Sequence, residues 1–112
     1  MSNFAQEWLQ AWNSHQLDSI MSHYAEDVVF YSPFIIKINN DPAGNLQGKM
    51  ALQAYFSKAL TAYPDLHFEL IQVLEGVNSF LLYYRSVDNR LSAEMMVLNH
   101  EGKVKEVRAH YA

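Results

Sequence analysis

The chain has 112 residues, of which 50% are apolar, and its formal net charge at pH 7 is −4. This length fits one domain, residues 1–112, that is small enough to gain stability from a partner surface, so we expect a homodimer. The Lys and Arg residues are scattered rather than clustered, which argues against a nucleic-acid partner. There is no cysteine, and no stretch approaches the roughly 18 apolar residues of a membrane helix, so we expect a soluble, cytoplasmic protein with no membrane partner.

Two amphipathic helices are predicted at the start of the chain. The first has one apolar stripe, and Ser2 is placed to cap it. The stripe consists of Phe4, Ala5, Trp8, Leu9 and Trp12. The same spacing recurs in residues 17–24, which predicts a second, shorter helix that ends before Asp27. Residues 28–32 are mostly β-branched and aromatic, so they predict a short strand that ends at Pro33.

The rest of the chain predicts one more helix and then four strands. Residues 34–38 are predicted to be extended, and the turn-forming residues 39–45 to make the longest loop. Helical spacing returns in residues 52–63, where the following proline predicts the end of a third helix. Turn signals at residues 76–78, 88–89 and 101–102 then divide the chain into an antiparallel meander of strands. Because helices come first and strands last, the predicted fold class is α+β.

No local motif for a metal or a nucleotide is complete. The five histidines form no His-x-His pair and no His-Glu-x-x-His sequence, so no metal site is predicted. Residues 44–50 place a Gly-Lys pair before a helix, as a phosphate-binding loop does. Their spacing is one residue short of that motif, and Met50 replaces the hydroxyl that would hold magnesium. We therefore expect no cofactor.

Several short segments, taken in order, carry a family resemblance. They are residues 8–13 (WLQAWN), 25–28 (AEDV), 32–33 (SP), 46–49 (LQGK), 63–66 (YPDL) and 102–104 (GKV). With this order and spacing the chain resembles the SnoaL-like branch of the nuclear-transport-factor-2-like superfamily. The resemblance implies a cone-shaped, cystatin-like roll, in which three N-terminal helices pack on a strongly curved mixed or antiparallel sheet, with a pocket at the wide end and frequent homodimerisation. It implies less about function, because the fold hosts isomerases, cyclases, dehydratases and many non-catalytic domains.

The ketosteroid isomerases of this superfamily allow a comparison residue by residue. Their general-base aspartate precedes the proline that ends the first strand, and here Ser32 takes that place. Their oxyanion-hole tyrosine lies on the first helix, where this chain has Trp8. Their second oxyanion donor is a protonated carboxylic acid on the penultimate strand, and here that position holds Glu94. Of the three catalytic groups of the ketosteroid isomerases, this chain thus keeps only the carboxylic acid. This argues against steroid isomerisation by that mechanism.

Glu94 is also the candidate catalytic residue when the sequence is considered without the family resemblance. It lies in the apolar segment 93–98, where both alternating faces are apolar, so its carboxylate is expected to leave water. Desolvation would raise its pKa, and a neutral carboxylic acid can donate to an oxyanion or act as a general acid. The alternative is an exposed glutamate at a strand edge or in an interface ion pair.

A concave face around Glu94 is predicted from strand alternation and from the resemblance. Its candidate ligand-binding residues are Trp8, Trp12, Phe30, Ser32, Tyr55, Phe56, Met96, Leu98, Val107 and Tyr111, with Ala109 beside them. Most of these side chains are equally consistent with simple core packing. Arg108 and His110 alternate with their neighbours and are predicted to face the other side of the sheet.

Two functions are compatible with these patterns. The first is a cofactor-free domain that binds a small apolar or aromatic carbonyl-type molecule, with Glu94 as the acid in an isomerisation, cyclisation or dehydration. The second is a non-catalytic binding or homodimerisation module whose aromatic side chains fill the pocket. The first predicts an open cavity that Glu94 and a hydroxyl group both face, and the second predicts a collapsed cavity and a structural hydrogen bond at Glu94.

Overall fold

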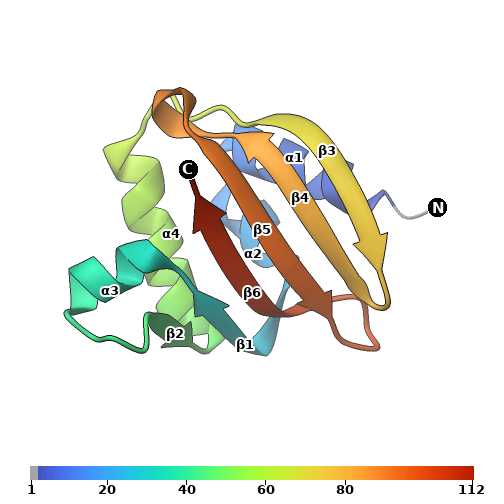
Figure 1. Ribbon diagram of the computed structural model, residues 1–112, viewed down its shortest axis with the longest axis horizontal. Helices are drawn as coiled ribbons and strands as arrows, with labels where there is room; N and C mark the ends of the chain where they lie inside the picture. Colours follow the sequence, from blue (N-terminus) through green and yellow to red (C-terminus); the bar gives the residue numbers. More distant parts are fainter. Residues whose placement is uncertain (1–2) are drawn as a thin grey trace.

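The computed structural model describes residues 3–112 as four α-helices and a six-stranded mixed sheet, which confirms the predicted α+β class (Figure 1). The helices are α1 (Phe4–Ser14), α2 (Leu17–Met21), α3 (Pro33–Asn39) and α4 (Lys49–Ala62). The strands are β1 (Tyr24–Tyr31), β2 (Asn45–Gln47), β3 (Glu69–Gly76), β4 (Ser79–Arg85), β5 (Leu91–Leu98) and β6 (Val104–Tyr111). No helix among the described residues is long and apolar enough to cross a membrane.

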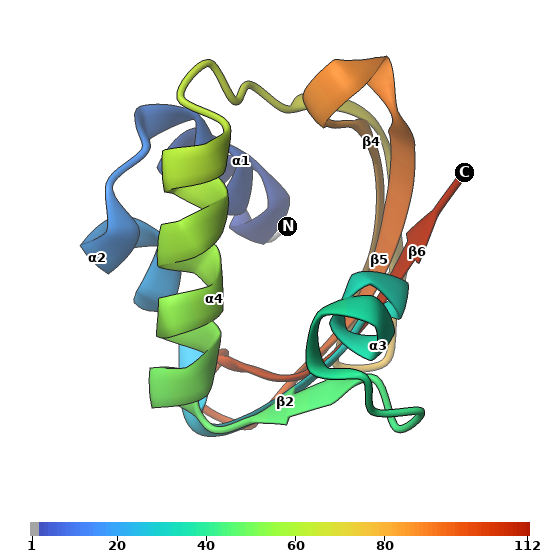
Figure 2. The same cartoon turned by 90° about the vertical axis from the view of Figure 1, so that its left-hand side faces the viewer.

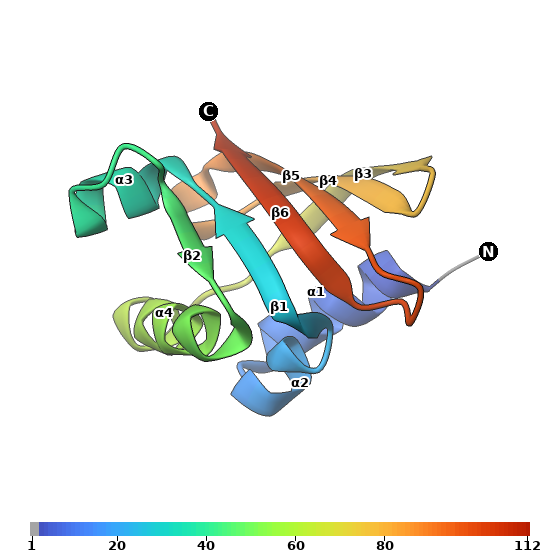
Figure 3. The same cartoon turned by 90° about the horizontal axis from the view of Figure 1, so that it is seen from below.

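The four C-terminal strands form the predicted antiparallel meander. The order across the sheet is β2-β1-β6-β5-β4-β3, and only β1 and β6 run parallel (Figure 3). The predicted turn signals fall between β3 and β4, between β4 and β5, and between β5 and β6. Cross-strand partners Phe80, Met96 and Val107 lie in register on the inner face, where all three are buried. The β4 and β5 registers also place Leu82 opposite Glu94.

The helices lie inside the curve of the sheet. Figure 2 shows the sheet bending around α1, α2 and α4, while α3 lies beside the short strand β2. Aromatic side chains fill much of the space between these layers: the ring centroid of Trp8 lies 5.7 Å from that of Phe68 and 5.2 Å from that of Tyr84. The indole N–H of Trp8 donates to the hydroxyl of Tyr24 at 3.1 Å, so this buried donor is satisfied.

The prediction that residues 34–38 are extended is wrong, because these residues lie in helix α3. Ser32 is the N-cap, and its Oγ accepts a hydrogen bond from the backbone N–H of Phe34 at 3.2 Å. Pro33 occupies the first helical position, where its fixed φ angle suits a helix and no N–H is needed. Asn40 ends the helix in the left-handed region. These end signals favour a helix over the extended conformation predicted for residues 34–38.

Other predicted boundaries also differ from the structure. The second helix ends at Met21 rather than Tyr24, because Tyr24 pairs with Val104 and starts β1. The predicted loop 39–45 ends where β2 pairs with β1, and the helix predicted from residue 52 begins three residues earlier, at Lys49. Residues 3–112 therefore contain four α-helices rather than three. The proposed cap Ser2 lies outside the described residues.

Candidate functional site

A cavity of about 570 Å³ lies between α3, α4 and the concave face of the sheet. Its wall includes the ends of β1, β4 and β6 and the start of β5, and aromatic and aliphatic side chains predominate. A cavity of this size accommodates a drug-sized molecule, and a few polar groups on an apolar wall can orient such a ligand. The polar side chains of the wall are therefore the candidates for chemistry.

Glu94 lies on this wall and is 5% exposed. It belongs to the inward-facing set of β5, between the buried residues Ser92 and Met96, as strand alternation predicted. The hydroxyl of Tyr84, on the neighbouring strand, donates a hydrogen bond to Oε2 of Glu94. Among residues 3–112, no group hydrogen-bonds its other oxygen, Oε1. One oxygen is thus held in place and the other is left for a bound molecule.

The protonation of Glu94 is set by its surroundings. Burial raises the pKa of its carboxyl group from 4.5 to about 7, because an apolar environment disfavours the charged form. The hydrogen bond from Tyr84 opposes this shift, since it stabilises the carboxylate. Near neutral pH, both the acid and the carboxylate are therefore populated. A group in this state can accept a proton and can also return one.

Tyrosine hydroxyls surround this carboxyl group. Burial raises the pKa of Tyr84, Tyr55 and Tyr111, and the negative charge of Glu94 raises each of them further. Hydrogen bonds with the Ser32 hydroxyl partly offset these shifts at Tyr55 and Tyr111. All three phenols consequently remain protonated across the physiological pH range. Tyr55 and Tyr111 line the cavity and can donate hydrogen bonds to an oxygen atom of a ligand.

Comparison with known proteins identifies the family. The profile of the SnoaL-like domain matches residues 5–111. The chain belongs to the SnoaL-like family. A SnoaL-like protein of unknown function from Burkholderia thailandensis is 44% identical, with a TM-score of 0.95 over 98% of this chain and 92% of the other. None of the curated proteins matches the sequence.

More distant structures share the fold. An epoxide hydrolase/cyclase-like enzyme of pyran ring formation in the polyether salinomycin has a TM-score of 0.77 at 17% identity, over 98% of this chain and 88% of the other. A candidate ketosteroid isomerase from Kribbella flavida has a TM-score of 0.74 at 15% identity, over 96% of this chain and 74% of the other. These similarities show that the SnoaL-like chain shares the fold of these proteins. They do not assign a reaction to it, so its chemistry has to be inferred from its own residues.

The structure brings part of the predicted site together. The predicted residues on the cavity wall are Trp12, Phe30, Tyr55, Phe56, Glu94 and Tyr111. Those away from the wall are Trp8, Ser32, Met96, Leu98 and Val107, with Ala109. The cavity occupies the end of the sheet where β5 begins, so side chains further along the concave face are covered by helices and form core. Ser32 is buried as the cap of α3, and Arg108 and His110 are exposed as predicted.

Several residues of the site were not predicted. Phe34 stacks near Tyr111, with 4.6 Å between ring centroids, and was missed because α3 had been predicted as extended. Tyr84 could have been found by aligning the hairpin around residues 88–89, since it falls two positions after Leu82, the partner of Glu94. Arg90 lines the cavity from the turn before β5. Among residues 3–112, no group of three or more His, Asp or Glu could hold a metal ion.

Proposed function

We propose that the cavity binds a small apolar or aromatic carbonyl compound and that Glu94 transfers a proton within it. The observation that carries this proposal is the state of the Glu94 carboxyl group. It is buried on the cavity wall, one oxygen is held by Tyr84, the other is unpaired among the described residues, and its pKa is about 7. Perturbed acids in apolar cavities with other convergent polar groups are typical of proton-transfer sites.

The proposed reaction uses a single acid–base group and no cofactor. Ionised Glu94 takes a proton from the carbon beside the substrate carbonyl, and the C–H electron pair moves to form an enolate. The enolate oxygen accepts hydrogen bonds from Tyr55 and Tyr111, which lower the energy of the developing charge. Where a C=C bond adjoins the deprotonated carbon, the enolate is a dienolate, and protonated Glu94 returns the proton to the far carbon of that bond as the double bond shifts and the carbonyl re-forms. Isomerisation needs only these two transfers, so Ser32 is not required as a base.

The alternative is a non-catalytic binding module. The open cavity favours ligand binding over a pocket filled by its own side chains. The hydrogen bond between Tyr84 and Glu94 is compatible with both functions, because it can orient a catalytic carboxylate or simply satisfy a buried one. Binding and proton transfer therefore have to be measured separately.

The experiment is α-proton exchange of 2-tetralone in D2O at pH 7, followed by NMR, together with thermal-shift binding. Wild type should accelerate the exchange, and Glu94→Gln should retain binding but lose the acceleration. Glu101→Gln, an exposed residue in the turn before β6, is the matched control and should behave like wild type. Binding without accelerated exchange would favour the non-catalytic module. A ligand at 100 times its Kd adds about 2.7 kcal/mol of stability, so the absence of any stabilisation by 2-tetralone would refute the pocket for this class of compound.

The proposal includes a homodimer formed through the outer face of the sheet. Leu74 and Leu81 are cross-strand partners on this face, and both are exposed, at 54% and 37%. Met95 is the next partner in the same row, so an apolar row crosses three strands. Such a row is costly in water and can be covered by a second copy. Leu81→Lys should convert a dimer to a monomer in light scattering, whereas Lys105→Gln, an exposed change on β6, should not.

A further inference from the structure

The cavity wall carries an excess of positive charge in a chain that is negative overall. Lys37, Lys58 and Arg90 line the cavity, against the carboxyl groups of Asp88 and Glu94. The formal net charge of the whole chain is −4. Among residues 3–112, none of the three cationic groups takes part in an ion pair. All three side chains are exposed, so water and salt screen their charge, but together at the rim of one cavity they still attract an anionic group.

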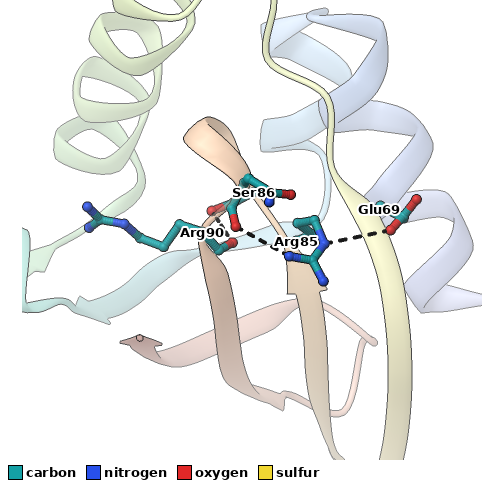
Figure 4. A network of polar contacts seen from close by, with 5 residues as sticks. Glu69, Arg85, Ser86 and Arg90 are labelled. Carbon is teal, nitrogen blue, oxygen red and sulfur yellow. Dashed lines mark hydrogen bonds and ion pairs between the residues drawn. The ribbon is translucent and has the colours of Figure 1, made fainter.

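Arg90 is the cation whose position is best defined. Its backbone carbonyl accepts hydrogen bonds from the N–H of Ser86 at 2.7 Å and from its Oγ at 3.2 Å, which hold the turn before β5. Its guanidinium carbon lies 5.4 Å from the ring centroid of Phe34 in α3. Figure 4 shows the side chain of Arg90 pointing away from Arg85, which reaches in the opposite direction towards Glu69. The two arginines flank one turn but face different surroundings.

Arg90 and Glu94 are far enough apart to contact opposite ends of one small ligand. They are four residues apart along an extended strand, which corresponds to roughly 13 Å between their backbones. Phe34 and Tyr111 supply aromatic wall at this end of the cavity. The positive charge of Arg90 lowers the pKa of Tyr111 against the larger effect of burial, so its field reaches the cavity.

We propose that the natural ligand of this site is an amphipathic carboxylic acid. Its carboxylate binds Arg90 at the rim, where a planar guanidinium can form two parallel hydrogen bonds with it. Lys37 and Lys58 add attraction without defined geometry. The apolar body lies against the aromatic wall, and the reacting carbon reaches Glu94. This inference rests on the proposed function and adds the substrate class to it.

The test compares two probes of nearly the same size and shape, one charged and one neutral: 2-tetralone carrying a carboxylate at ring position 6, and the corresponding carboxamide. Calorimetry at pH 7 and low salt should show the carboxylate binding roughly two- to fivefold more tightly, and this preference should shrink as salt is raised. Arg90→Gln should remove most of the preference, and binding of the carboxamide to this variant would show that it is folded. Arg85→Gln, the matched control, should retain the preference.

Three results would overturn the inference. Equal affinity for the two probes would refute the acid as ligand and leave the proposed function intact, provided that wild type still exchanges the α-protons. A carboxylate preference that survives Arg90→Gln, or that Arg85→Gln reduces equally, would refute the assigned binding group. Failure of both probes to bind would refute the proposed function together with this inference.

Discussion

The burial of Glu94 predicts a pH-dependent difference in stability between wild type and Glu94→Gln. The folded-state pKa of Glu94 is raised from 4.5 to about 7, so the fold binds a proton more tightly than the unfolded chain does. The stabilisation from this proton is fully present below pH 4.5 and is lost as pH rises through 7. A rise of this size is worth about 3 kcal/mol, since each tenfold change in acidity corresponds to about 1.4 kcal/mol. Glutamine has nearly the same shape, accepts the Tyr84 hydrogen bond and does not ionise.

Urea unfolding of both proteins at pH 5 and pH 8 measures this effect. Relative to wild type, Glu94→Gln should gain about 2–3 kcal/mol of unfolding free energy between the two pH values, most of the expected total. The other titratable groups are common to both proteins, so their contributions cancel in the difference. Glu101→Gln should show no such gain, because Glu101 is exposed. Parallel pH profiles for wild type and Glu94→Gln would refute the raised pKa and with it the proposed acid–base role.

Two further predictions concern the framework that holds the cavity. Tyr24→Phe should lower the unfolding free energy by about 1–3 kcal/mol in urea titration, because the buried N–H of Trp8 loses its acceptor; an unchanged midpoint would show that this hydrogen bond contributes nothing. Gly44→Ala should cost about 1–2 kcal/mol for its φ of +61°, and more because a Cβ would lie 2.7 Å from Cγ1 of Ile36 in α3. Gly102→Ala has a similar φ of +79° and no atom within 4 Å of the added Cβ, so equal losses in the two variants would exclude the clash.

The C-terminal strands could be predicted from local patterns, because the turn residues and the alternation of side chains there indicate the same structure. Turn residues at 76–78, 88–89 and 101–102 define the hairpins, and alternation from the hairpin ends places Glu94 on the inner face. The residues of α3 are different, since β-branched side chains favour a strand while a Ser-Pro start favours a helix. The helix prevails because Ser32 supplies the cap and Ile35 is fully packed, at 1% exposed. The energy of that packing comes from distant elements, which no local pattern describes.

The position of the cavity along the sheet is harder to predict than the face on which it lies. Trp8 and Trp12 occupy the same stripe of α1, one turn apart, yet only Trp12 lines the cavity, while Trp8 is 1% exposed within the core. Met96 and Glu94 show the same contrast on β5, where a shift of two residues changes a cavity wall into packed core. Periodicity specifies direction, whereas the boundary between cavity and core depends on where α4 and α3 end over the sheet. Predicting the site therefore requires the helix ends, and the wrong assignment of α3 is the reason that Phe34 and its neighbour Arg90 were missed.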